Sequence, residues 1–269
     1  MNVFLLELRI LRKSFVIRTL SVAGVIVLML AFFPSMQSEA MKALAGAKLE
    51  GIDPALLAAL GLSTMMDFTV IANYFGYVLQ YVTLVIMVLV TQQAVSLLIK
   101  EESDGTIEFL CAKPLSRSEI FFQKLLAHLA ATIGMIAVCA AATVIGYLAV
   151  SDYTLGEAVK EVVTFYYGIL FVGVLFTSVG VFLSTLIKSS KAVAGIAIAI
   201  VFGTFILGMM SAVVENLDFL IWFSPMDWIK PQKLLTDGIL PEEWIVGCSV
   251  ILLSPSAAWL RYRRKDLLI

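Results

Sequence analysis

Charged residues are scarce in this 269-residue chain, which contains only 14% Asp, Glu, Lys and Arg. A soluble domain averages about 25% of these residues. At the same time, 61% of the chain is hydrophobic. The shortage of charge excludes an ordinary soluble domain and indicates a protein that lies mostly within a lipid bilayer.

Cysteine and histidine are also rare, with three Cys and one His. Cys139 and Cys248 lie in apolar runs, and Cys111 lies in a segment that we expect to be cytoplasmic, so no disulfide framework is predicted. The single histidine, His128, has no Cys, Asp or Glu partner nearby and is interpreted as structural. We therefore expect neither a metal site nor a catalytic residue in this chain.

A phosphate-binding loop is missing as well. The motif G-x-x-x-x-G-K-[ST] occurs nowhere in the sequence, and "GTIEFLCAK" (residues 105–113) lacks the second glycine and the hydroxyl after the lysine. No soluble stretch is long enough for a nucleotide-binding domain. Any ATP-driven activity must therefore use an ATPase in another chain, and no cofactor is expected in this one.

Long apolar runs are what the chain has in abundance, and each is close to the roughly 20 residues that a membrane-spanning helix needs. Their central portions contain no Asp, Glu, Lys or Arg, which argues against an ion-coupled carrier and an intramembrane enzyme. Without internal repeats, the simplest prediction is one all-α membrane domain, residues 1–269, with six spans. The expected spans are Thr19–Met36, Val70–Leu98, Leu126–Val150, Val162–Ile187, Ala192–Val214 and Trp244–Leu260.

Basic residues are distributed unevenly around these runs. With the N-terminus inside, 14 of the 19 Lys and Arg residues fall on the cytoplasmic side, as the positive-inside rule requires. Both termini are therefore expected in the cytoplasm, in a bacterial-type cytoplasmic membrane. The alternative, a signal peptide cleaved near "SMQSEA", would place the basic segment "RYRRKD" outside and is disfavoured.

Two segments on the predicted outer side are expected to form helices, one within 36–67 and one within 215–243. The second should fold back into the outer interface as short helices. The four tryptophans are expected at the membrane–water interfaces, as an aromatic belt. They are Trp222, Trp228, Trp244 and Trp259.

The most polar stretch lies between the second and third spans and is predicted to be cytoplasmic. Asp104 is suited to cap a short helix, and Pro114 ends it. Ser116 and Glu119 have the S-x-x-E spacing of a capping box that begins the next helix. The local pattern is equally compatible with a well-capped turn that binds no partner.

The string "EESDGTIEFLCAKPLSRSEIFFQKLLA" resembles the segment after the second span of ABC-2 type transporter permeases. That family tends to show an acidic pair, then G-T-[IL]-E, a short hydrophobic run, proline, Ser/Thr-Arg and a lysine. The plan of six spans with both ends inside is similar too, although Gln123 stands where the family often has a small residue. The matching positions are Glu101, Glu102, Gly105, Thr106, Glu108, Pro114, Ser116, Arg117 and Lys124.

The resemblance implies that this stretch contains the coupling helix, which docks on a separate ABC ATPase subunit and transmits its ATP-driven movements. It also implies a homo- or heterodimer of permeases, with ATP and Mg used by the ATPase subunits. Membrane lipid is a further partner, and no nucleic acid is expected. The residues predicted to contact the ATPase subunit are Glu101, Glu102, Gly105, Thr106, Glu108, Phe109, Leu110, Lys113 and Arg117.

The first 18 residues form an amphipathic pattern. Arg9, Arg12 and Lys13 share one face of a helix, and apolar residues share a neighbouring face. The pattern resembles the N-terminal interfacial elbow helix of the permease family. The simpler alternative is a basic segment that precedes the first span.

Neutral polar and small residues mark two of the spans. Asn73, Tyr77, Gln80 and Thr91 project on one side of the second span, where they are candidates for a translocation path or for hydrogen bonds to a neighbouring helix. On the fifth span, Gly195, Ala199 and Gly203 recur every four residues and form a ridge that permits close helix approach. In the family these two spans flank the cavity at the dimer interface.

These observations favour the permease subunit of an ABC exporter, which is not itself an enzyme. It would move an amphipathic or hydrophobic substrate by alternating access, driven by the ATPase subunit. One alternative is a passive channel or secondary carrier, which the lack of buried charge disfavours. Another is a membrane anchor or assembly protein that uses the capped loop as a docking platform.

Overall fold

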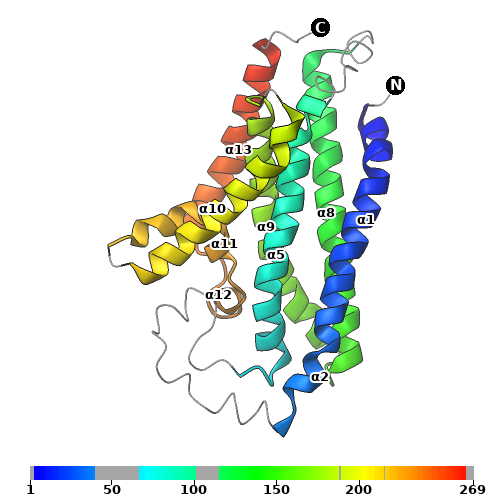
Figure 1. Cartoon of the computed structure of the whole chain (residues 1–269), viewed down its shortest axis with the longest axis vertical. Helices are drawn as coiled ribbons and strands as arrows, with labels where there is room; N and C mark the ends of the chain where they lie inside the picture. Colours follow the sequence, from blue (N-terminus) through cyan, green and yellow to red (C-terminus); the bar gives the residue numbers. More distant parts are fainter. Residues whose placement is uncertain (1–2, 40–66, 101–114, 188, 215, 265–269) are drawn as a thin grey trace.

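The computed structural model describes residues 3–39, 67–100, 115–187, 189–214 and 216–264. Within these ranges the regular secondary structure is helical, with no strand. Six helices are long and apolar enough to cross a membrane, which confirms the predicted fold class. The first residue of α1 (Val3–Ala31) and the last residue of α13 (Pro241–Arg264) lie at the same end of the bundle, called here the terminal end (Figure 1). The opposite end is called the distal end.

The expected N-terminal helix is present, but its form differs from the prediction. Instead of a separate elbow helix, α1 runs from Val3 to Ala31 without a break and is followed by the short α2 (Phe33–Met36). The sequence explains this continuity, because no Gly or Pro occurs before Gly24 to interrupt the helix.

Two helices form the centre of the bundle, α5 (Ile71–Ser96) and α9 (Leu155–Ser184). In each, 67% of the most apolar 18-residue stretch is buried, against at most 33% in the other four spans. They approach each other closely at Gly180, where an added Cβ would lie 2.6 Å from the Ala94 Cβ and 3.2 Å from the Thr91 carbonyl oxygen. Only glycine permits this approach, which is typical of helix packing in membranes.

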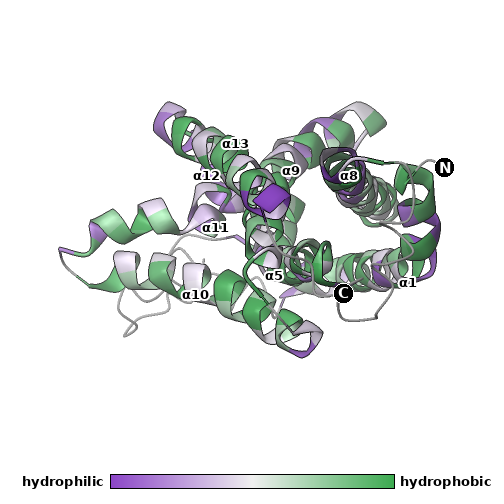
Figure 2. Cartoon of the chain, turned by 90° about the horizontal axis from the view of Figure 1, so that it is seen from above, coloured by the Kyte–Doolittle hydropathy of each residue, from purple (hydrophilic) through white to green (hydrophobic). Residues whose placement is uncertain are grey.

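The remaining spans surround this pair. The long α8 (Arg117–Val150) packs against α9 and carries α1 on its other side, while α13 packs against α9. After the short η1 (Ser190–Ala192), α10 (Val193–Val213) contacts α5 but leans away from the other spans (Figures 1 and 2). The outward surface of the bundle is largely apolar, as contact with lipid requires (Figure 2).

The described residues between α10 and α13 form three short helices, as expected, while their place at the outer membrane interface stays a prediction. The helices are η2 (Asp218–Phe223), α11 (Pro225–Trp228) and α12 (Pro231–Thr236). Trp228 is buried within the protein: its side chain is only 1% exposed and its indole N–H donates to the Ile221 carbonyl. The chain carries this tryptophan into the bundle when it folds back. The predicted position of the four tryptophans at the membrane interfaces stays a prediction.

We predict that Gly180→Ala lowers the free energy of unfolding by about 1–3 kcal/mol, because its Cβ would overpack the contact between α5 and α9. The measurement is thermal unfolding of the purified protein in detergent.

The matched control is Gly24→Ala in α1, where an added Cβ meets nothing within 4 Å. Since alanine favours a helix over glycine by about 0.5–1 kcal/mol, the control is expected to be neutral or stabilising. Equal melting temperatures for the two variants would contradict the proposed contact.

Candidate functional site

The predicted ATPase-contact residues fall mainly outside the described residues. Those between Glu101 and Lys113 all lie there, and only Arg117 is described, as the exposed first residue of α8. The predicted capping box is present: Ser116 Oγ accepts from the Glu119 N–H at 3.2 Å, and Glu119 Oε2 accepts from the Ser116 N–H at 2.7 Å. The cap fixes where α8 begins, immediately after residues 101–114.

A buried ammonium group lies at the terminal end of α8. Lys124 is 1% exposed, and its Nζ donates to the Leu97 carbonyl oxygen at 2.9 Å. The same Nζ lies 3.7 Å from Oε2 of Glu7, which is also buried. Gln123 adds a second link, because its Oε1 accepts from the Phe4 N–H at 3.2 Å. One short part of α8 therefore contacts both α1 and the chain leaving α5.

The end of α13 joins the same region. The Trp259 indole N–H donates to Ser118 Oγ at 3.0 Å, and the Arg263 guanidinium lies over the Trp259 ring, 5.0 Å from its centre. Phe121 and Tyr262 are buried beside each other nearby. The terminal ends of α5, α8 and α13 thus converge around the two ends of the 101–114 segment.

The four polar residues predicted for a translocation path occupy different surroundings. Asn73 Nδ2 donates to the Asp67 carbonyl at 3.0 Å, and Tyr77 packs against Tyr81, both towards the distal end of α5. Thr91 Oγ1 donates to the Met87 carbonyl of its own helix at 2.7 Å, within the contact between α5 and α9. Their shared role in a path stays a prediction.

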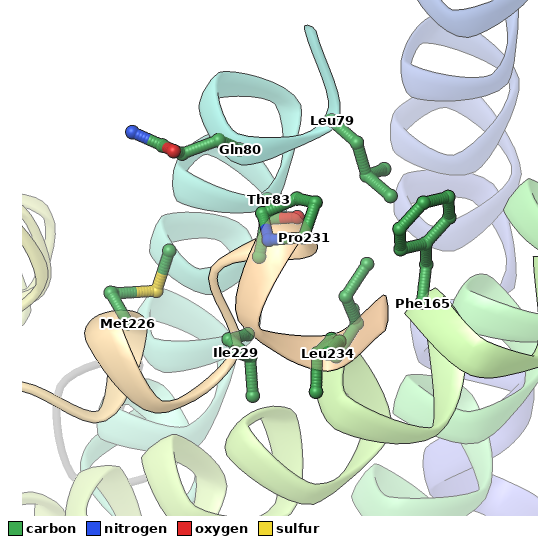
Figure 3. A pocket seen from close by; sticks show the side chains of 9 residues that line it. Leu79, Gln80, Thr83, Phe165, Met226, Ile229, Pro231 and Leu234 are labelled. Atoms are coloured by element: carbon green, nitrogen blue, oxygen red, sulfur yellow. The ribbon is translucent and has the colours of Figure 1, made fainter. Parts of the chain in front are cut away.

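Gln80 differs from the other three because it is buried and its Nε2 has no hydrogen-bond partner within the described part of the chain. It lines a small cavity between α5, α9 and the fold-back segment, and its side chain extends away from Phe165 (Figure 3). The cavity volume is about 10 Å³, enough for roughly one water molecule. The other lining residues are Leu79, Thr83, Ile169, Met226, Ile229, Pro231 and Leu234.

Residues 224–239, called here the plug, close this cavity on its distal side. Two glycines make room for the plug: a Cβ on Gly76 would lie 2.9 Å from Pro231 Cβ, and one on Gly168 would lie 3.0 Å from Ile229 Cγ2. Met226, Trp228, Ile229 and Leu234 are all buried. The plug therefore fills the space between the distal halves of α5 and α9.

The start of the plug is held by a buried carboxylate. Asp227 accepts from Ser224 Oγ at 2.6 Å and forms an ion pair with Lys230. Asp227 and Ser224 both lie against α10 at Gly208, where an added Cβ would fall 1.4 Å from Asp227 Oδ2 and 2.4 Å from Ser224 Oγ. A side chain of any size at position 208 is incompatible with this arrangement.

The end of the plug is tied to α13. Lys233 forms an ion pair with Glu243, which also accepts from the Leu240 N–H at 2.9 Å. Glu243 is buried, whereas the Lys233 side chain is 21% exposed. The two basic residues of the plug, which depart from the positive-inside pattern, thus have acidic partners within the fold.

The connection between α8 and α9 carries a second polar group at the distal end. Glu161 accepts from the hydroxyls of Tyr147 at 2.6 Å and Tyr153 at 3.1 Å. Burial and then the neighbouring Glu161 charge raise the pKa of Tyr153 to about 12. Tyr153 therefore remains a neutral hydrogen-bond donor throughout the physiological pH range.

The small-residue ridge on α10 faces open space. An added Cβ on Gly195 or Gly203 would meet nothing within 4 Å, and Ala199 is exposed. The ridge thus packs against no other described part of the same chain. Its predicted role in helix packing stays a prediction.

Groups suited to hold a metal ion are not found in the described ranges. His128 is buried beside the backbone of Val90, without a cluster of Cys, Asp or Glu around it. The polar groups of the bundle instead hold helices and the plug in place.

Comparison with protein families decides what kind of protein has this arrangement. The model of the ABC-2 family transporter proteins matches residues 1–267. The chain belongs to this ABC-2 family. A comparison with curated proteins found no match.

The family and the six apolar helices make the chain an integral membrane protein, the permease subunit of an ABC transporter. Membership implies association with an ABC ATPase subunit. Sequence reasoning missed two features of this permease: the partners of Lys124 and the acidic anchors of the plug. An isolated Glu or Asp in the sequence gives no sign of a distant lysine, so no local signal was present.

We predict that Gly208→Ala in the permease displaces Asp227 and loosens the plug. Overpacking costs about 1–3 kcal/mol, so labelling of a cysteine at the buried Met226 by a water-soluble maleimide should become about tenfold faster. The assay uses Met226→Cys in a background with the three native cysteines replaced by alanine.

Gly24→Ala in α1 is the control, since its Cβ meets nothing within 4 Å and it lies outside the ridge of α10. It should leave the labelling rate unchanged. Equal rates in both variants would show that Asp227 does not hold the plug against α10.

Proposed function

We propose that the chain is the permease of an ABC exporter that moves an amphipathic or hydrophobic substrate across the cytoplasmic membrane by alternating access. The observation that carries the proposal is the family match along residues 1–267 in a chain without a phosphate-binding loop. ATP and Mg are used by the separate ATPase subunit, and this chain contributes no cofactor site. Both termini lie in the cytoplasm, as the distribution of basic residues favours.

The ATPase subunit contacts the segment from Glu101 to Arg117. Three described features support this assignment: the capping box at Ser116, the exposed Arg117, and the convergence of α5, α8 and α13 around the segment's two ends. A force applied to this segment acts on all three helices. In this role residues 101–117, called here the coupling segment, transmit the movements of the ATPase subunit to the bundle.

The second permease subunit covers α10. The exposed ridge of Gly195, Ala199 and Gly203 offers a close helix contact, and α10 leans away from its own bundle (Figure 1). Gln80 and its cavity lie on α5, the neighbour of α10 within the chain. The substrate path runs beside α5 and α10, and the plug closes it at the distal end.

We predict that charge reversal in the coupling segment uncouples the permease from its ATPase. Glu108→Lys and Arg117→Glu should each reduce co-purification of the ATPase subunit, and the associated ATP hydrolysis, by about tenfold, because like charges across an interface are repulsive. The measurement is affinity purification in mild detergent from cells that express the genomic neighbours, with mass spectrometry and an ATPase assay.

Glu39→Lys is the control, since Glu39 is an exposed carboxylate three residues after α2, which lies at the distal end (Figure 1). It should co-purify the ATPase subunit as the wild type does. If the wild-type chain purifies without an ATPase subunit, the result would contradict the coupling role of this segment and favour the channel or anchor alternatives.

We also predict that leucines at Gly195 and Gly203 together prevent close contact of two permeases and shift the particle from dimer to monomer. Light scattering on the detergent-solubilised protein measures the mass. Gly24→Leu on the open face of α1 should leave the mass unchanged. An unchanged dimer in the double variant would place the interface elsewhere.

A further inference from the structure

The buried ammonium group of Lys124 lies where three parts of the chain meet: α1, α8 and the residue that follows α5. Leu97, whose carbonyl accepts its hydrogen bond, is the first residue after α5 and precedes the coupling segment. Lys124 itself lies about two turns into α8, which follows that segment. The Lys124 side chain thus connects α8, which follows the coupling segment, to Leu97, which precedes it.

A second partner of Lys124, Glu7, belongs to the N-terminal helix. Glu7 is buried at 5% exposure, whereas Arg9 and Arg12 of the same helix are exposed. Phe4, one turn earlier, is held by Gln123 through its backbone N–H. The start of α1 therefore contacts Lys124 and Gln123 of α8, and Lys124 also binds the residue that precedes the coupling segment.

Simple stabilisation does not require a charge here. Replacing a buried ion pair by apolar residues of similar volume is often neutral or stabilising, because burial of both charges is costly. The ammonium group adds a directional hydrogen bond to a backbone carbonyl and an electrostatic attraction to a carboxylate on a different element. An apolar contact would let these elements slide past one another.

We propose that Lys124 is a positioning residue that joins the start of α1 to both ends of the coupling segment, so that movement imposed by the ATPase subunit also moves α1. This inference rests on the proposed function, in which residues 101–117 contact that subunit. It adds α1 to the moving part of the permease and assigns Glu7 as the receiving group.

The test uses the complete permease–ATPase complex and hydrogen–deuterium exchange of backbone amides in residues 3–12. The exchange is compared without nucleotide and with Mg²⁺ and a non-hydrolysable ATP analogue. In the wild type the nucleotide should change exchange in this segment. This measurement needs no transported substrate. A purely stabilising role of Lys124 would affect the basal exchange rate but not its change on nucleotide binding.

Three variants sharpen the comparison. Lys124→Met should abolish the nucleotide response of residues 3–12 and raise their basal exchange by about tenfold. Lys124→Arg keeps the charge and the donors and should retain the response. Glu7→Gln keeps the bond to Leu97 and should reduce the response without unfolding α8. The exposed Lys191→Met is the control for loss of a lysine.

Each outcome decides the proposal. A wild-type response in Lys124→Met, or no response of residues 3–12 in a wild-type complex that hydrolyses ATP, overturns it. Raised basal exchange in Lys124→Met with an intact nucleotide response would reduce Lys124 to a structural tie, which also overturns it. Failure of the wild type to hold an ATPase subunit is the separate failure of the proposed function, and Lys124 then has no movement to transmit.

Discussion

The close approach of α5 and α9 at Gly180 is the constraint on which the rest of the bundle depends. Within lipid, apolar surfaces gain little by contacting one another, so helices associate where small residues allow tight packing. Since α5 and α9 are the two most buried spans, every other span is placed by its contact with them or with α8, which itself packs on α9. A bulkier residue at position 180 would separate the two helices and alter all of these contacts.

Packing at glycines fixes how α5 and α9 meet, and polar groups add contacts at the two ends of the bundle. At the terminal end, Lys124 donates a hydrogen bond to the chain after α5 and forms an ion pair with Glu7 of α1. At the distal end, Asp227 and Glu243 hold the plug to α10 and α13. Directional contacts are needed at the ends because an apolar surface there has no preferred register against its neighbour.

The sequence was sufficient for features that depend on local chemistry. Apolar runs located all six spans, and the Ser116–Glu119 spacing located the start of α8 because a capping box involves only four residues. A second box, Thr154–Glu157, begins α9 earlier than the predicted span does and carries the same signature. The burial of Trp228 and the partners of Lys124 depend on how distant segments meet, which neither periodicity nor composition encodes. The residues of the predicted coupling segment before position 115 lie outside the described ranges.

The two polar ends differ in a way that bears on transport. The lysines that hold the plug, Lys230 and Lys233, have side chains 25% and 21% exposed, whereas that of Lys124 is 2% exposed. Only the lysine of each plug pair reaches water, because Asp227 and Glu243 are buried. Separating such a pair therefore costs more than separating a fully exposed pair, which costs about 1 kcal/mol or less, and less than separating a pair that is buried on both sides. Separating a buried pair leaves an uncompensated charge and costs about 3–5 kcal/mol. We therefore expect the distal contacts to open and close during the transport cycle, while the contacts of Lys124 persist and the terminal ends of α1, α5 and α8 move as one unit.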